Sequence, residues 1–292
     1  MAARRTTAGT HPSLRPVTVR AALRAQIGTA LAQIRNRAPS DEEVHSARKC
    51  IKKARATLRL LRELIGTPIY RRENQALRDA ARTLSAARDI KVLLDILQAM
   101  VKRCSLDPTS ADVLRRSLIR KRKRLHRQAI SRAGVTHARR ALRAVERRAS
   151  RWNLSQADVA PITEAVRKTY KRGRRGQSLA RANPTVALMH EWRKQVKYLW
   201  HQLQMLEPLS AELVAMAEMS HRLSDYLGED HDLAVLRAVM IAKRHLLSAR
   251  PLQSALTSID RRRQMLEKKA FGLGRRLYSE KSPGFVRERR AE

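Results

Sequence analysis

The sequence is poor in the residues that build turns, disulfides and aromatic cores. Ten glycines and ten prolines in 292 residues leave too few turn positions for an all-β fold. The only cysteines, Cys50 and Cys104, exclude a disulfide framework and a zinc site built on cysteine. Aromatic residues make up 3% of the chain, so its 43% hydrophobic content is mostly aliphatic. Such a composition is typical of long helices.

Long apolar runs are missing as well. No stretch of about 18 apolar residues is present, so we expect no membrane span. Residues 1–20 lack the apolar segment of a secretory signal. They are rich in Arg and free of acids, as in a transit peptide, but we interpret residues 1–15 as a flexible arm. Two cysteines and no signal favour the cytoplasm.

Acidic residues are few beside basic ones. Lys and Arg number 63 against 26 Asp and Glu, which gives a formal charge of +37. Charge of one sign opposes compaction unless a polyanion neutralises it. The charge therefore indicates either a bound polyanion or a solvated basic surface that serves solubility.

The chain contains a duplicated motif. His45 and His190 each begin the pattern H-x-x-R-K-x-x-K, 145 residues apart. A later pair, Arg88-Asp89, matches His231-Asp232 at an offset of 143 residues, and a Leu-Ser pair precedes each. Because several matches keep one order and nearly one offset, we infer an internal duplication.

Apolar residues follow the motif with helical spacing in both copies. They recur at alternating intervals of three and four residues: Val44, Ala47, Ile51, Ala54, Leu58 and Leu61, then Met189, Trp192, Val196, Leu199, Leu203 and Leu206. Ser40 with Glu43 forms a capping box signature, and Asn183 with Pro184 is expected to start the second motif helix.

Breaks at Gly and Pro divide the rest of the chain. Helices are expected over residues 17–37, 40–65, 71–104 and 109–132, and over 156–175, 184–207, 209–248 and 251–279. We expect residues 134–154 to be a linker with a short helix, and residues 171–183, which hold two glycines, to be a loop.

Basic residues form a row along the first motif helix. At 100° per residue, six side chains share an arc of about 100° beside the apolar stripe: His45, Arg48, Lys52, Arg55, Arg59 and Arg62. The second copy keeps His190, Arg193 and Lys197, but Trp200, Gln204 and Glu207 replace the last three. The second row is therefore shorter.

A further basic segment lies at residues 115–127, where Arg116, Arg120, Arg124 and Arg127 stand among other cations. No acid occurs between Asp112 and Glu146. Because like charges at this density destabilise a helix, the segment predicts either a bound anion or a solvated basic face.

Nucleic acid is the usual partner of a strongly basic chain. Single-strand binders stack bases on exposed aromatic side chains, yet Trp200 is the only aromatic residue in a basic row. Inorganic polyphosphate has no bases to stack and can be held by Lys and Arg alone. The sequence favours polyphosphate, with nucleic acid as a competing polyanion.

The duplicated motif and the later L-S-…-[R/H]-D-x-x-V-L pattern resemble the CHAD family, the conserved histidine α-helical domain. The resemblance implies an all-α domain of two similar bundles, about four helices each, related by pseudo-two-fold symmetry with a basic cleft or pore between them. A single domain would span residues 16–280, with repeats at 16–133 and 155–280 and a frayed tail at 281–292. It also implies binding of inorganic polyphosphate, often at polyphosphate granules, without catalysis.

Carried onto this sequence, the resemblance and the basic rows give one set of candidate residues. The predicted polyphosphate-binding residues are His45, Arg48, Lys49, Lys52, Arg55, Arg59, Arg88, Arg116, Arg120, Arg124, Arg127, His190, Arg193, Lys194, Lys197 and His201. Asp89 and Asp232 are expected to orient neighbouring cations, because a carboxylate would repel phosphate.

Two other functions compete with this prediction. An enzyme could be built on His231 and Asp232 with Asp225, Glu229 and Asp230 nearby, but we interpret these acids as residues of a turn between helices. We therefore expect no catalysis, no cofactor and no metal. A nonspecific nucleic-acid-binding protein would use the same basic rows and is the main alternative.

Overall fold

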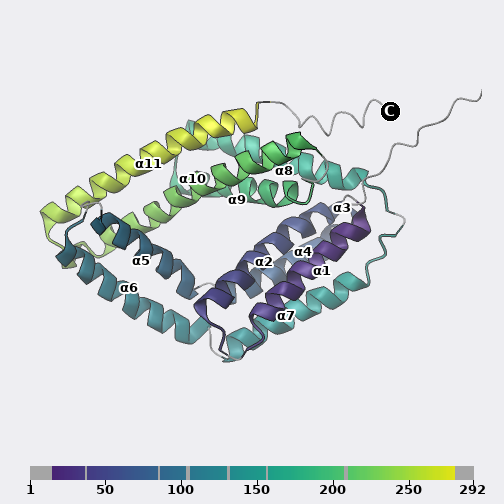
Figure 1. The fold of residues 1–292 in the computed structure, drawn as a ribbon, viewed down its shortest axis with the longest axis horizontal. Coiled ribbons are helices and arrows are strands. Elements are labelled where there is room, and N and C mark those ends of the chain that lie inside the picture. Colours follow the sequence, from purple (N-terminus) through teal and green to yellow (C-terminus); the bar gives the residue numbers. More distant parts are fainter. Residues whose placement is uncertain are drawn as a thin grey trace, which may run out of the picture.

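The computed structural model is all-α, as the sequence predicts (Figure 1). It describes residues 15–36, 38–84, 86–102, 106–129, 132–155, 157–206 and 210–279. These hold a short 3-10 helix, η3 (Arg244–Leu246), and no strand. Their α-helices are α1 (Pro16–Gln33), α2 (Asp41–Leu60), α3 (Arg62–Ile65), α4 (Thr67–Thr83), α5 (Ala86–Lys102), α6 (Pro108–Ala129), α7 (Arg132–Ser150), α8 (Ala160–Ala182), α9 (Val186–Leu203), α10 (Ala211–Ala242) and α11 (Ala249–Leu277).

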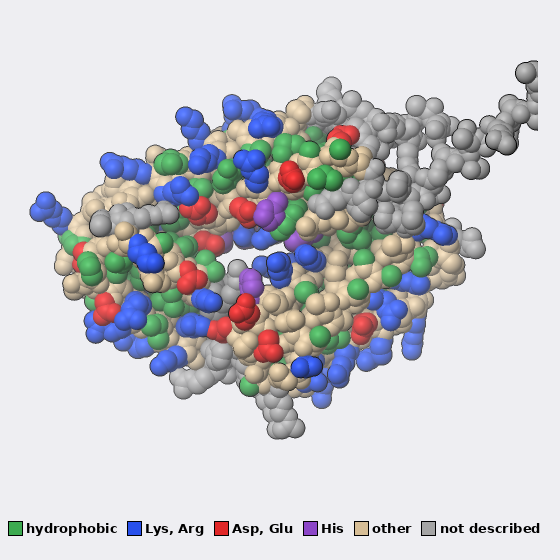
Figure 2. Space-filling view, viewed as in Figure 1, with side chains coloured by type: hydrophobic (Ala, Val, Ile, Leu, Met, Phe, Trp, Pro, Cys, Tyr) green, Lys and Arg blue, Asp and Glu red, His purple; other side chains and the backbone are tan. Residues whose placement is uncertain are grey.

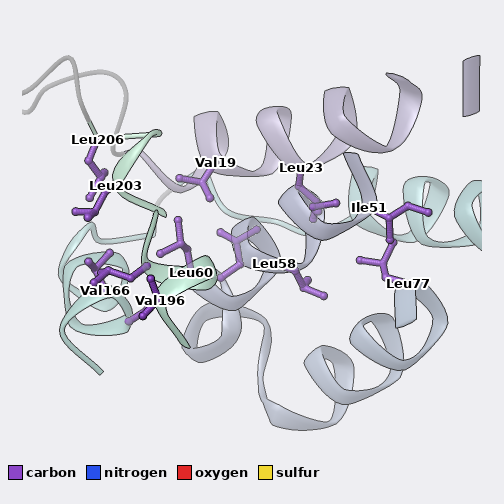
Figure 3. Packing of buried hydrophobic residues seen from close by; sticks show 14 of the residues in the cluster. Val19, Leu23, Ile51, Leu58, Leu60, Leu77, Val166, Val196, Leu203 and Leu206 are labelled. Carbon is purple, nitrogen blue, oxygen red and sulfur yellow. The ribbon is translucent and has the colours of Figure 1, made fainter. Parts of the chain in front are cut away.

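Two hydrophobic clusters hold these helices together. The larger one joins α1, α2, α4 and α7 to α8 and α9, and Figure 3 shows Leu60, Val166 and Val196 meeting within it. The smaller one lies between α5, α6, the second part of α10 and the first part of α11. Because α10 and α11 belong to both clusters, they tie the α5–α6 pair to the rest of the molecule (Figure 1).

The predicted stripes of the two motif helices are confirmed. All twelve apolar residues of the stripes are at most 3% exposed. α2 begins with the predicted capping box, in which the Glu43 amide donates to Ser40 Oγ over 3.2 Å and the Ser40 amide donates to the Glu43 carboxylate over 2.6 Å. α9 differs, because Thr185 and not Asn183 is its N-cap, with its hydroxyl accepting from the Leu188 amide.

Three sequence-based boundaries are wrong. The helix expected over residues 71–104 is two helices, α4 and α5, since α4 ends at Thr83. The linker expected at 134–154 contains the 19-residue helix α7, which packs against α1 and α4. The loop expected at 171–183 is the continuation of α8 to Ala182.

Close packing explains the two glycines inside α8. A Cβ atom on Gly173 would lie 2.9 Å from Cζ of Tyr278, and one on Gly176 would lie 3.3 Å from Cα of Trp192. The glycines therefore let α8 approach neighbouring elements closely, a use that composition alone does not distinguish from a loop.

A matched pair of substitutions tests this explanation. We expect Gly173→Ala to lower the free energy of unfolding by about 1–3 kcal/mol, because the buried Tyr278 ring must move. Gly272→Ala in α11, where an added Cβ meets nothing within 4 Å, is expected to be neutral or to raise it by up to about 1 kcal/mol. Urea unfolding of both variants measures the difference. Equal effects would contradict the packing explanation.

Two predicted terminal segments fall almost entirely outside the residues that the structure describes. The predicted arm at 1–15, apart from Arg15, and the predicted tail at 281–292 lie outside the described residues. Among the residues that the structure describes, no helix is long and apolar enough to cross a membrane.

Candidate functional site

The two motif helices line one pocket together with α10. Its volume is about 220 Å³. The lining residues are His45, Arg48, Lys49 and Lys52 from α2, Arg193, Lys197, Trp200 and His201 from α9, and Asp225 and Asp232 from α10. Figure 2 shows the molecule hollowed near its centre, with Lys, Arg and His side chains gathered there. The structure thus brings together seven of the predicted binding residues and the orienting residue Asp232.

Cations outnumber carboxylates in this pocket. Arg and Lys supply five side chains to it, whereas Asp225 and Asp232 are its two acids. Arg48 is only 7% exposed, so its guanidinium lies close to the protein interior, where charges interact more strongly than in water. Gly228 of α10 makes room for Arg193, since a Cβ there would lie 3.4 Å from a guanidinium nitrogen. The arrangement can hold an anion through several cations at once.

The second motif histidine lies beside the pocket and not in its lining. The His190 ring lies against His231 with 4.5 Å between centroids and a tilt of 36° between the ring planes, and its buried Nδ1 has no hydrogen-bond partner among the described residues. Burial, followed by the charges of His231, Arg193 and Lys194, lowers the pKa of His190. Burial is the largest of these causes. The lowered pKa favours the neutral imidazole of His190.

Lys194 also lies outside the pocket lining. Its ammonium group pairs with Glu191 one turn earlier in α9 over 2.7 Å, and both side chains are exposed. The motif therefore does not place all four of its residues on the same surface in α9. In α2, by contrast, all four motif residues line the pocket.

His201 and Trp200 form an aromatic group at the pocket edge. The Trp200 ring stacks on His201 at 4.5 Å and meets His221 edge-on at 4.1 Å. Burial lowers the pKa of His201 to about 4, so its imidazole is neutral at pH 7. It can take part in a hydrogen bond but adds no charge there.

The later part of the first basic row does not reach this pocket. Arg59 lies over the Tyr198 ring, 4.2 Å from its centroid, and Arg55 lies 6.0 Å from the same centroid. Arg55 Nε also donates to the Asn74 side chain over 3.0 Å. A helical wheel places these arginines in line with Arg48 and Lys52, but the neighbouring helix α9 separates their environments.

The basic segment 115–127 forms a different surface on α6. Arg116 pairs with Asp112 over 2.9 Å. Arg120 and Arg124 line a separate pocket with Lys121 and Lys243. The side chains of Arg88, Asp89 and Arg127 lie outside the described part of the structure. Arg116, Arg120 and Arg124 thus lie apart from the motif pocket. For Arg88, Asp89 and Arg127 the prediction is not tested.

Asp225, Glu229 and Asp230 lie within α10. Their interpretation as residues of a turn between helices is therefore wrong. Glu229 accepts from Arg262 at 2.7 Å, and Asp230 accepts from Arg263 at 2.8 Å. Both arginines belong to α11, and Arg237 of α10 pairs with Asp260 of α11 in the same way at 2.8 Å. The acids therefore fasten α10 to α11. In the described residues, no group of three or more His, Cys, Asp or Glu is arranged to hold a metal.

Sequence reasoning missed two residues near the basic rows. Tyr198 receives the two guanidinium groups of α2 on its ring, and Arg172 lies in a segment that was expected to be a loop. No spacing in the sequence links them to α2, because their proximity arises only when α8 and α9 pack on it.

Comparisons with known proteins agree with this architecture. PptA from Streptomyces chartreusis has a similar fold, with a TM-score of 0.68 and 17% sequence identity over 90% of this chain and 99% of that chain. No curated protein sequence matches the chain. A model of the CHAD domain matches residues 21–240. Because that match covers well over half of the sequence, the chain belongs to the CHAD domain family.

Proposed function

We propose that the protein binds inorganic polyphosphate without chemically changing it. The observation that carries the proposal is the pocket in which five cationic side chains from α2 and α9 meet two carboxylates. Phosphate oxygens accept paired hydrogen bonds from guanidinium groups and are neutralised by ammonium groups. His45 in the pocket lining and His190 beside it would donate hydrogen bonds to phosphate oxygens. The family of the chain supports the same ligand.

Aromatic geometry favours an anion without bases. Trp200 is the only aromatic residue other than histidine that lines the pocket in the described part of the chain. One of its faces is covered by His201, and His221 contacts it edge-on. Trp192 is fully buried and stacks on Phe271. A base would therefore find little open ring surface on which to stack.

The proposed function also concerns the relation between the two motif helices. We infer that α2 and α9 are equivalent helices of two related halves and that they face the same polyphosphate chain across a basic cleft. The unequal basic rows would make one side of the cleft richer in cations than the other. A protein of this kind would be located in the cytoplasm, at polyphosphate granules.

The absence of catalysis is part of the proposal. Hydrolysis of a phosphoanhydride needs a positioned nucleophile or a metal. Glu229 and Asp230 are engaged by α11 arginines, and Asp225 pairs with His221 over 3.2 Å. We expect polyphosphate of unchanged chain length to be recovered after long incubation with the protein.

A competition titration separates polyphosphate from nucleic acid. At equal phosphate and equal salt, we expect long-chain polyphosphate to displace labelled duplex DNA, because the pocket offers cations but little stacking surface. Fluorescence anisotropy of the labelled DNA measures the displacement. A basic peptide of equal charge provides the control for nonspecific attraction. If DNA wins the competition, the protein is a nucleic-acid-binding protein instead.

A further inference from the structure

A second group of arginines lies at the C-terminal end of α2, away from the pocket. Arg59 is in α2, Arg62 begins α3, and Arg172 comes from α8. α8 packs against both α2 and α3, and Figure 1 shows these helices meeting at one end of the molecule. Lys168, one turn before Arg172, pairs with Glu63 of α3 over 3.1 Å. This ion pair holds the Arg172 face of α8 against α3.

Two of the three guanidinium groups are positioned by aromatic rings and not by acids. Arg59 lies 4.2 Å from the centroid of Tyr198, and Arg62 lies 5.4 Å from that of Tyr70. The Nε atoms of both arginines are buried with no hydrogen-bond partner in the described part of the chain. Buried donors without acceptors are rare because each is unfavourable. One NH2 group of Arg62 also donates to the Thr67 hydroxyl over 3.4 Å. The rings fix the guanidinium planes, and the terminal nitrogens, rather than the buried Nε atoms, are the groups that a ligand can reach.

Positive charge is concentrated at this point. Burial, and after it the charges of Arg59 and Arg62, lower the pKa of Arg172. Glu63, the carboxylate whose charge acts on Arg172, is engaged by Lys168. Because arginine does not lose its proton at neutral pH, three like charges stay close together in the free protein. A ligand with more than one negative charge would remove that repulsion most effectively.

We propose that Arg59, Arg62 and Arg172 bind the terminal phosphate of a polyphosphate chain. A terminal phosphate carries close to two charges at neutral pH, like a phosphate monoester, and has three oxygens free to accept hydrogen bonds. An internal phosphate carries one charge and has two such oxygens. Three guanidinium groups on three helices that pack together match the end of the chain better than its interior. This inference rests on the proposed function, and it assigns the chain end a site distinct from the motif pocket.

The test compares a short polyphosphate with free ends and the same chain with both ends blocked as alkyl phosphoramidates. Binding is measured by calorimetry for the unchanged protein, for Arg172→Gln and for Arg181→Gln. Arg181 is an exposed arginine on the opposite side of α8, so its variant loses the same charge. Blocking the ends is expected to weaken binding about tenfold in the unchanged protein and in Arg181→Gln, by loss of charge-assisted hydrogen bonds. In Arg172→Gln it should weaken binding by no more than about twofold.

The outcomes distinguish this inference from the function on which it rests. If blocking weakens all three proteins equally, the arginine group does not recognise the chain end. If the unchanged protein fails to bind even the free chain, the proposed function itself is wrong. Arg59→Lys keeps the charge but loses the planar group that stacks on Tyr198. It should make the blocking effect smaller than in the unchanged protein, and a blocking effect that stays at about tenfold would contradict a role of the Arg59 guanidinium in recognising the chain end.

Discussion

Replacing Arg48, Lys52, Arg193 and Lys197 together by alanine is expected to weaken polyphosphate binding about a hundredfold or more at low salt. All four side chains line the motif pocket. Even at about 0.7 kcal/mol for each screened contact, four contacts sum to a factor of that size. Arg48 is buried, so its contact is expected to exceed the value for an exposed pair.

Salt dependence makes the same prediction sharper. By analogy with single-stranded nucleic acid, each contacted phosphate contributes about 0.7 to the slope of log affinity against log salt. The quadruple variant should therefore have a slope smaller by about 3. Titrations at several salt concentrations measure it, and circular dichroism checks that helicity is retained.

A control variant removes equal charge elsewhere. Arg147, Arg181, Arg261 and Arg275 are exposed arginines that do not line the motif pocket. Their joint replacement by alanine lowers the net charge by the same amount but should leave the slope nearly unchanged. If the pocket variant also keeps its slope, polyphosphate binds elsewhere, and the basic surface of α6 becomes the first candidate.

Periodicity predicted the parts of the fold that depend on one helix at a time. The alternation of three and four residues identified every buried residue of the α2 and α9 stripes. The Ser40–Glu43 cap was equally local, because its two hydrogen bonds join residues three positions apart. Such features are written into short stretches of sequence and need no knowledge of the neighbouring helices.

Features that depend on two helices were not predictable in the same way. Gly173 and Gly176 resemble loop residues until Tyr278 and Trp192 occupy the space that their side chains would fill. Asp230 resembles a turn residue until α11 supplies Arg263. In each case the partner is far away in the sequence, so a local pattern does not show why that residue type is needed.

The same limit applies to the candidate site. A helical wheel places Arg48, Lys52 and Arg59 in one row. The structure divides that row, because Arg48 and Lys52 line the motif pocket whereas Arg59 stacks on Tyr198. The sequence thus predicted which helices carry the cations. It could not predict that the packing of α9 on α2 would divide these cations between the motif pocket and the ring of Tyr198.

The largest effect on stability is expected at the contact of α10 with α11. Asp230 is 2% exposed and accepts a hydrogen bond from Arg263 Nε at 2.8 Å. Burial raises the pKa of Asp230, and Arg263 opposes that rise. Burial and then the charge of Asp230 also raise the pKa of Glu267. Arg263 thus holds two neighbouring carboxylates in their charged form.

Removing this arginine leaves a buried carboxylate without its partner. At neutral pH, Arg263→Met is expected to lower the free energy of unfolding by about 3–5 kcal/mol. Urea unfolding measures the change. Arg261→Met, at an exposed position of the same helix, should stay within about 0.5 kcal/mol of the unchanged protein.

The pH dependence identifies the cause. A carboxyl group whose pKa is higher in the folded than in the unfolded protein binds more protons when folded, so its effect on stability becomes less favourable as pH rises between the two values. Without Arg263 the folded pKa of Asp230 rises further. The deficit of Arg263→Met should therefore be smallest in acid and grow toward neutral pH, and adding Asp230→Asn should remove most of that growth. A deficit that is the same at every pH would mean that the lost packing of the arginine side chain, and not a buried charge, destabilises the variant.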